Sequence, residues 1–160
     1  MDKSEKIKLD EYYMNEALSL ARAAASEGEI PVGALIVKDG EVIATGHNLR
    51  EKSGLATAHA EILAIEEACR RLGGWRLSGC TLYVTLEPCP MCAGAIVNSR
   101  VDRVVYGADD ASAGCLKSVI NFNSYPFSHA FSVTGGILEE ECREVLQNFF
   151  KIKRKTNTEE

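Results

Sequence analysis

The sequence predicts an α/β layered domain with a mixed central sheet of about five strands flanked by helices. Segments with apolar residues at helical spacing alternate with short β-branched segments. The turn pair Asp39-Gly40 joins the first two β-branched segments and indicates an antiparallel hairpin. Helical crossovers separate the later strands and permit parallel pairing, so the sheet is expected to be mixed.

Helices are expected where apolar residues recur every three or four positions, at residues 10–27, 57–71, 88–97 and 138–155. Gly28 and the pair Gly73-Gly74 follow the first two helices as stop signals. Thr57 has the residue type and place of an N-cap for the second helix. Pro88 and Pro90 are tolerated only around a helix start, which they indicate for the third helix.

Strands are expected in short β-branched runs, at residues 32–38, 42–45, 81–85, 101–106 and 131–134. Residues 108–128 lack periodicity and are rich in Ser, Asn and Gly, so we expect a long, functional loop with one helical turn. We expect one domain over residues 1–155, with residues 156–160 as a frayed C-terminal tail.

Composition narrows the class of protein. The chain has 18 basic and 23 acidic residues, so a nucleic-acid partner must be held by a local basic patch. The charged segment 1–10 predicts no signal peptide, and no apolar run reaches the length of about 18 residues that predicts a membrane span. Six irregularly placed cysteines favour a cytoplasmic enzyme with metal-binding thiolates over a disulfide framework.

Two short segments carry the candidate chemistry, His59-Ala60-Glu61 and Pro88-Cys89-Pro90-Met91-Cys92. One His and two Cys leave the fourth position of a tetrahedral zinc for water, as in catalytic zinc sites. Mixed thiolate and imidazole ligands favour zinc over other divalent metals. Glu61 is too close to His59 to be a comfortable fourth ligand and is suited to carry a proton. Together they predict hydrolytic removal of an amino group from a ring carbon.

The residues also allow plainer interpretations. Zinc could be structural, with Cys115 as its fourth ligand, or Cys89 and Cys92 could be ordinary packing residues. Prolines on both sides of Cys89 argue against packing, because they fix turn geometry. The other cysteines are expected to be buried apolar residues: Cys69, Cys80, Cys115 and Cys142. His47 and His129 lack ligand spacing and are expected to be structural or surface residues.

The two segments resemble the signature of the cytidine deaminase superfamily, in which His and two Cys bind zinc and a non-ligand Glu carries the proton. Within it, the chain resembles the bacterial tRNA-specific adenosine deaminases over residues 29–34, 46–48, 57–61, 82–95, 99–100, 104–108 and 136–138. This resemblance implies a three-layer α/β/α cytidine-deaminase-like fold with one zinc per subunit. It also implies a homodimer that converts adenosine to inosine at the first anticodon position of tRNA, most often tRNA-Arg.

The resemblance further implies contacts with the tRNA anticodon stem-loop. Asn48 would touch the flipped nucleoside, Val32 would pack on its base, and Asp110 would contact the RNA backbone or sugar beside it. Each has an ordinary alternative: Asn48 as a turn residue, Val32 as core, and Asp110 as a capping side chain. Ser128 stands where the family usually has Asn and lacks the amide donor. Residues 113–118 also differ from the usual pattern.

The C-terminal segment 149–154 resembles the aromatic and basic ending that grips neighbouring anticodon bases and phosphates. Phe150, Lys153 and Arg154 are the expected RNA contacts, whereas Phe149 fits the apolar stripe of the last helix. Two other functions remain open. A guanine or cytosine/cytidine deaminase would need no such RNA grip, and a non-enzymatic zinc module would have no use for Glu61.

Overall fold

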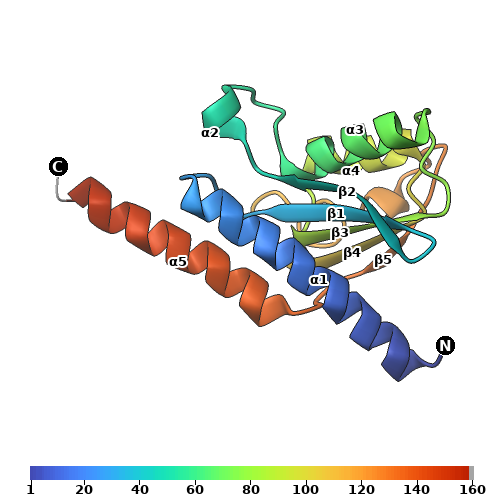
Figure 1. Ribbon diagram of the computed structural model, residues 1–160, viewed down its shortest axis with the longest axis horizontal. Coiled ribbons are helices and arrows are strands. Elements are labelled where there is room, and N and C mark those ends of the chain that lie inside the picture. Colours follow the sequence, from blue (N-terminus) through green and yellow to red (C-terminus); the bar gives the residue numbers. More distant parts are fainter. Residues whose placement is uncertain (159–160) are drawn as a thin grey trace.

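A mixed five-stranded sheet lies at the centre of the computed structural model, which describes residues 1–158 (Figure 1). Its strands are β1 (Gly33–Lys38), β2 (Glu41–His47), β3 (Cys80–Leu86), β4 (Arg103–Ala108) and β5 (Ser132–Thr134). They lie in the order β2-β1-β3-β4-β5. Strand β1 is antiparallel to β2 and β3, whereas the β3–β4 and β4–β5 pairs are parallel. The mixed sheet predicted from the sequence is therefore confirmed.

Helices cover both faces of the sheet. They are α1 (Lys3–Ser26), α2 (Arg50–Ser53), α3 (Ala60–Leu72), α4 (Pro90–Ser99) and α5 (Glu139–Thr158), with a 3-10 turn, η1, at Phe122–Ser124. Helices α3 and α4 pack on one face, and α1 and α5 pack on the other (Figure 1). This arrangement confirms the three-layer α/β/α fold and the single helical turn in the long loop.

Side chains that alternate along the strands fill two separate cores, because successive residues of a strand point to opposite faces. On β1, Ile36 packs toward α3 and α4, whereas Leu35 packs toward α1. A buried ion pair also ties α1 to the sheet. The Asp10 carboxylate accepts hydrogen bonds from both terminal nitrogens of Arg103, at 2.9 and 2.7 Å, and from the Tyr83 hydroxyl at 2.7 Å.

Two predicted helix starts were wrong. Helix α1 begins at Lys3 rather than at residue 10, because Asp2 and Glu5 form a capping box in which each side chain accepts the other's backbone N–H. The N-cap of α3 is His59 rather than Thr57, whose carbonyl instead accepts the His59 N–H at 2.8 Å. The helix starts later than expected, and His59 is therefore the residue immediately before it.

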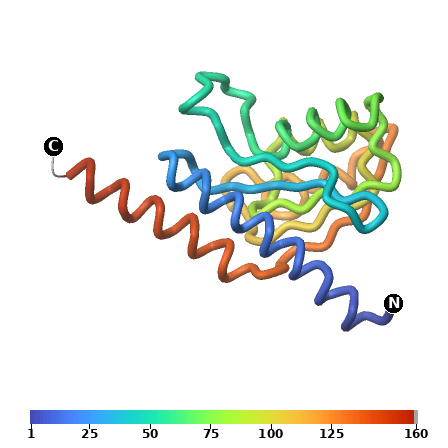
Figure 2. Tube along the Cα trace, viewed as in Figure 1, coloured from blue at the N-terminus to red at the C-terminus, as the bar shows by residue number. Residues whose placement is uncertain are grey.

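The start of α1 and the end of α5 lie at opposite ends of the molecule (Figure 2). Helix α5 continues through Thr158 and so includes part of the segment expected to fray, while Glu159 and Glu160 fall outside the described residues. Helix α2 was not anticipated from the sequence. Within residues 1–158, no helix has both the length and the apolar character needed to cross a membrane.

Candidate metal centre and substrate cavity

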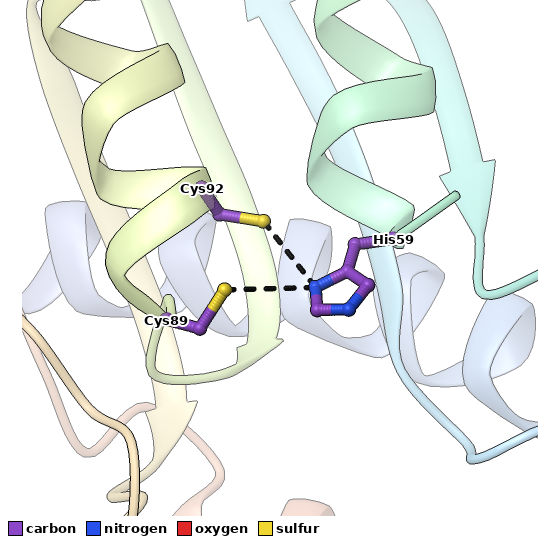
Figure 3. A group of neighbouring side chains, drawn as sticks. All are labelled: His59, Cys89 and Cys92. Carbon is purple, nitrogen blue, oxygen red and sulfur yellow. Dashed lines mark hydrogen bonds between the residues drawn. The ribbon is translucent and has the colours of Figure 1, made fainter. Parts of the chain in front are cut away.

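The three candidate ligands meet where the starts of α3 and α4 lie side by side (Figure 3). His59 immediately precedes α3, Cys89 immediately precedes α4, and Cys92 lies in the first turn of α4. The Nδ1 atom of His59 is 3.6 Å from the Cys89 Sγ and 3.5 Å from the Cys92 Sγ. All three ligand atoms lie within 4.8 Å of one another. Two helix starts thus bring together ligands that are thirty residues apart in sequence.

These distances fit a tetrahedral zinc ion. Zn–S bonds of about 2.3 Å and a Zn–N bond of about 2.05 Å would separate the nitrogen from each sulfur by about 3.5 Å. The group of ligand atoms found among residues 1–158 does not include Cys115, whose Sγ donates to the Ala113 carbonyl at 3.3 Å. A site closed by Cys115 as a fourth ligand therefore has no geometric support.

The remaining cysteines and histidines lie outside the group of candidate metal ligands. Cys80, Cys115 and Cys142 are buried, whereas Cys69 is only half-buried. The His129 Nε2 lies 2.7 Å from the Val101 carbonyl, and His47 lies 3.3 Å from the Glu27 carboxylate. These contacts agree with the structural or surface roles expected for both histidines.

The charges at the centre are set by burial and by mutual hydrogen bonds. A hydrogen bond from Cys92 lowers the pKa of Cys89 to about 4, whereas the same contact and burial raise the pKa of Cys92. The hydrogen bond with Cys89 raises the pKa of His59. Burial raises the pKa of Glu61, whose side chain is only 4 % exposed. The backbone N–H of Cys92, at the start of α4, favours the thiolate form of Cys89, as metal ligation requires.

A cavity of about 160 Å³ opens beside these residues and is lined by His59, Glu61 and Cys89. Its volume is below the range of about 300–1,000 Å³ that holds drug-sized ligands, so it suits a single base rather than a longer nucleic-acid segment. Glu61 thus lines a cavity that could hold one base, and it shares this cavity with the candidate ligands His59 and Cys89.

The structure places the predicted substrate residues in two groups. Val32, Asn48 and Asp110 line the same cavity as Glu61. Asn48 also has the predicted turn role, because its Oδ1 accepts the Arg50 N–H at 3.2 Å. All three therefore face the cavity beside Glu61.

The other predicted contacts lie outside the cavity. Ser128 is exposed in the loop after β4, and Phe150, Lys153 and Arg154 lie along the second half of α5. Lys153 lines a separate groove between α5 and the end of α1. In Figure 1 the C-terminal half of α5 extends beyond the sheet on the side where α2 and the start of α3 lie.

Sequence reasoning missed several cavity residues: Ile30, Arg50, Leu86 and Glu87. It also missed Glu29, a buried carboxylate that accepts the backbone N–H groups of Glu51 and Lys52 at the start of α2. The available signal was an acidic residue beside an apolar strand, which is unusual at a buried position unless the carboxylate is hydrogen-bonded.

Glu87 shows how such a buried carboxylate stays ionised. Burial opposes its charge, but hydrogen bonds from Ser118 and from backbone N–H groups of the following loop lower the pKa of Glu87 below its usual value. The carboxylate is 1 % exposed and is thus compensated by protein donors rather than by water.

Comparisons with known proteins agree with this geometry. Residues 7–108 match the family model of the cytidine and deoxycytidylate deaminase zinc-binding region. Over 147 residues the chain is 54 % identical to the tRNA-specific adenosine deaminase of Bacillus subtilis strain 168, covering 91 % of each chain.

Solved structures show the same relationship. A tRNA:A34 deaminase that performs A-to-I editing at the wobble position superposes with a TM-score of 0.82 and 46 % identity, covering 84 % of this chain and 99 % of the other. The guanine deaminase of Nitrosomonas europaea superposes with a TM-score of 0.77 but only 28 % identity, covering 87 % and 83 % of the two chains.

Proposed function

Because this chain belongs to the cytidine and deoxycytidylate deaminase family, we propose that it converts adenosine to inosine at the wobble position of tRNA. The observation that carries the proposed chemistry is the presence of Glu61 in one cavity with His59 and Cys89, which form a group of possible metal ligands together with the buried Cys92. The choice of a tRNA adenosine over a free base is supported by the 54 % identity with a tRNA-specific adenosine deaminase.

Zinc bound by His59, Cys89 and Cys92, one ion per chain, would activate water for attack on C6 of adenine. Glu61 takes a proton from the attacking water and delivers it to the departing amino group, so adenosine and water become inosine and ammonia. Burial of Glu61 favours its protonated form, which helps the carboxyl hold that proton between the two steps.

Residues around Glu61 would orient the base. Val32 packs against its ring, the Asn48 amide hydrogen-bonds to its polar edge, and Asp110 contacts the adjoining sugar or backbone. Outside the cavity, Phe150 stacks on a neighbouring base while Lys153 and Arg154 neutralise phosphates. Ser128 would meet the RNA from the loop after β4. Its side chain is shorter than that of the usual Asn and lacks an amide donor.

The same resemblance supports the remaining assignments. Residues 1–155 would belong to one deaminase domain, and two copies would form a homodimer. The enzyme would work in the cytoplasm with tRNA-Arg as its usual substrate. Similarity to the Bacillus subtilis tRNA-specific adenosine deaminase across 91 % of both chains supports these proposals.

The zinc-loaded protein should be given an arginine-tRNA anticodon stem-loop with adenosine at the wobble position, guanine, cytosine and cytidine in separate reactions. Ammonia and inosine should form from the stem-loop alone. A stem-loop with guanosine at that position is the matched control and should release no ammonia. Reaction with none of the substrates would refute a deaminase function.

A guanine deaminase is the second candidate, favoured by the superposition on the Nitrosomonas europaea enzyme. In that case guanine would release ammonia and the adenosine stem-loop would not. The exposed aromatic and basic residues of α5 disfavour this candidate, because a free base fills the cavity without touching them.

A further inference from the structure

Glu87 is a buried acid that the proposed reaction does not use. It follows β3 directly and precedes the Pro88-Cys89 pair that begins the metal-binding segment. Its carboxylate lies against the loop that follows β4. A buried charge in such a place is costly unless several donors compensate it.

Residues 110–118, the first part of this loop, supply these donors. The Glu87 Oε1 accepts the Asp110 N–H at 3.0 Å and also the Ser118 hydroxyl. Its Oε2 accepts the N–H groups of Leu116, Lys117 and Ser118 at 3.1, 2.8 and 2.9 Å. A carboxylate offers about four acceptor sites, so these donors use its whole capacity and leave none for substrate.

These hydrogen bonds between Glu87 and the loop determine where one wall of the cavity lies. Asp110 and Ala113 line the cavity, and both belong to the turn that Glu87 holds at its start. Within that turn the Asp110 Oδ1 accepts the N–H groups of Ser112 and Ala113 at 3.0 and 3.2 Å. Glu87 therefore fixes the backbone from which the Asp110 side chain reaches the cavity.

Close packing leaves the loop little freedom to shift. A Cβ atom added at Gly114 would lie only 2.3 Å from the Glu87 carboxylate. The Cys115 N–H also donates to the Pro88 carbonyl at 2.9 Å, next to Glu87 in sequence. The wall is thus held by the segment that carries the metal ligand Cys89, and their relative position depends on Glu87.

We propose that Glu87 is a positioning residue that sets substrate affinity by holding Asp110 and Ala113 against the cavity. This inference rests on the proposed tRNA deaminase function. Although Glu87 lines the cavity, the loop donors occupy its carboxylate oxygens, so it makes no hydrogen bond to the substrate and carries no transferred proton. Its removal should weaken substrate binding far more than the chemical step, since Glu61 and the metal ligands are held by other contacts.

The test is Glu87→Gln in the full-length, zinc-loaded protein with the adenosine stem-loop as substrate. The Gln amide replaces one acceptor oxygen by a donor that faces the loop donors, which displaces the loop. We expect KM to rise about tenfold, kcat to change less than threefold, and zinc content to stay as in the unchanged protein. An unchanged KM, or a loss of zinc, would overturn the proposal.

Asp10→Asn is the matched control, because it makes the same chemical change at a buried carboxylate in the core on the opposite face of the sheet. It should lower the melting temperature and leave KM unchanged. A similar rise in KM for both variants would show that general destabilisation, rather than positioning, explains the effect.

A double-mutant cycle with Asp110→Ala tests the route of the effect. If Glu87 acts through Asp110, Glu87→Gln should change KM less than about threefold once Asp110 is already Ala. Undiminished tenfold effects in both backgrounds would refute this route. Should Glu87→Gln fail to fold, Ser118→Ala removes one donor and should raise KM about threefold, and an unchanged KM there would also overturn the proposal.

The unchanged protein separates this inference from the proposed function. If the unchanged protein does not deaminate the stem-loop, the proposed function fails and there is no reaction in which Glu87→Gln could change KM. If it does, every result above concerns Glu87 alone.

Discussion

The cavity and the C-terminal half of α5 differ in how their side chains are held. Glu61 and Asn48 in the cavity are 4 % and 6 % exposed, whereas Phe150 on α5 is 41 % exposed. Cavity residues come from segments far apart in sequence, while the α5 residues follow one another along a single helix. The first region is built by the whole fold, and the second by one helix.

This difference matches two different physical tasks. Bond making requires reacting groups in a fixed geometry, which buried and hydrogen-bonded side chains provide. Attraction of phosphates and stacking on bases tolerate movement, because charge acts at a distance and every base has a flat face. Substitutions of Glu61 or of the candidate metal ligands should therefore lower kcat or metal content, whereas substitutions on α5 should weaken RNA binding.

The largest effect is expected for Glu61→Ala. Loss of the proton carrier should lower kcat on the order of 1,000-fold or more, while zinc content and stem-loop affinity remain unchanged. Inosine formation measured under saturating stem-loop tests this. Glu66→Ala is the control, because Glu66 lies on the same helix but is exposed and pairs with Arg70. Turnover retained by Glu61→Ala would disprove the mechanism.

Removal of a metal ligand should have the next largest effect. Cys89→Ala should leave the purified protein with much less than one zinc per chain and lower activity by at least about 100-fold. Zinc can be measured by elemental analysis of the purified variant. Cys69→Ala should keep both, because Cys69 is outside the ligand group. Full zinc binding by Cys89→Ala would remove Cys89 from the ligand set.

On α5, the paired change Lys153→Gln and Arg154→Gln should reduce stem-loop affinity about tenfold at low salt without changing kcat. Two lost phosphate contacts should make the slope of log affinity against log salt shallower by about 1.4. Lys3→Gln with Lys6→Gln is the matched control at the opposite end of the molecule (Figure 2). An unchanged slope in the α5 variant would show that this helix does not hold the RNA phosphates.

Phe150→Ala separates stacking from charge on the same helix. The Phe150 ring packs edge-on against Phe149, with 5.5 Å between centroids, and its outer surface is exposed. Loss of one base-stacking surface, about 1 kcal/mol, should weaken stem-loop binding about fivefold and leave the salt slope unchanged. Ile152→Ala removes an exposed apolar side chain that has no flat face, and should have less effect. Equal losses would argue against stacking.

Sequence reasoning succeeded where chemistry imposes a local pattern. His59, Glu61 and the two cysteines could be recognised because the metal site needs those residue types at short spacing. Pro90 likewise marked the start of α4, because its missing N–H is tolerated there. Local rules thus predicted the start of α4 and, through Gly73-Gly74, the end of α3, but not the N-cap of α3.

Sequence reasoning failed where a buried carboxylate is bound by backbone N–H groups that are distant in sequence. The donors to Glu87 lie 23 to 31 residues away, and those to Glu29 lie 22 and 23 residues away. Almost every residue has a backbone N–H, so the sequence carries no signal of which one a carboxylate will bind. Helix α2 and the contacts of Glu87 with the loop after β4 were therefore unpredictable from local pattern, although Arg50, Asp110 and Ala113 line the cavity.

The smallest effect is expected for Ser128→Asn, which restores the residue that the family usually has. Ser128 is exposed and lies outside the cavity wall, so a new amide donor there should change KM less than about threefold. Ser4→Asn at the exposed start of α1 is the control for a surface change. A tenfold fall in KM for Ser128→Asn alone would show that the side chain at position 128 contacts the substrate directly. The part of the site that needs a fixed geometry would then extend beyond the cavity to residue 128. Only the residues of α5 would remain as contacts that tolerate movement.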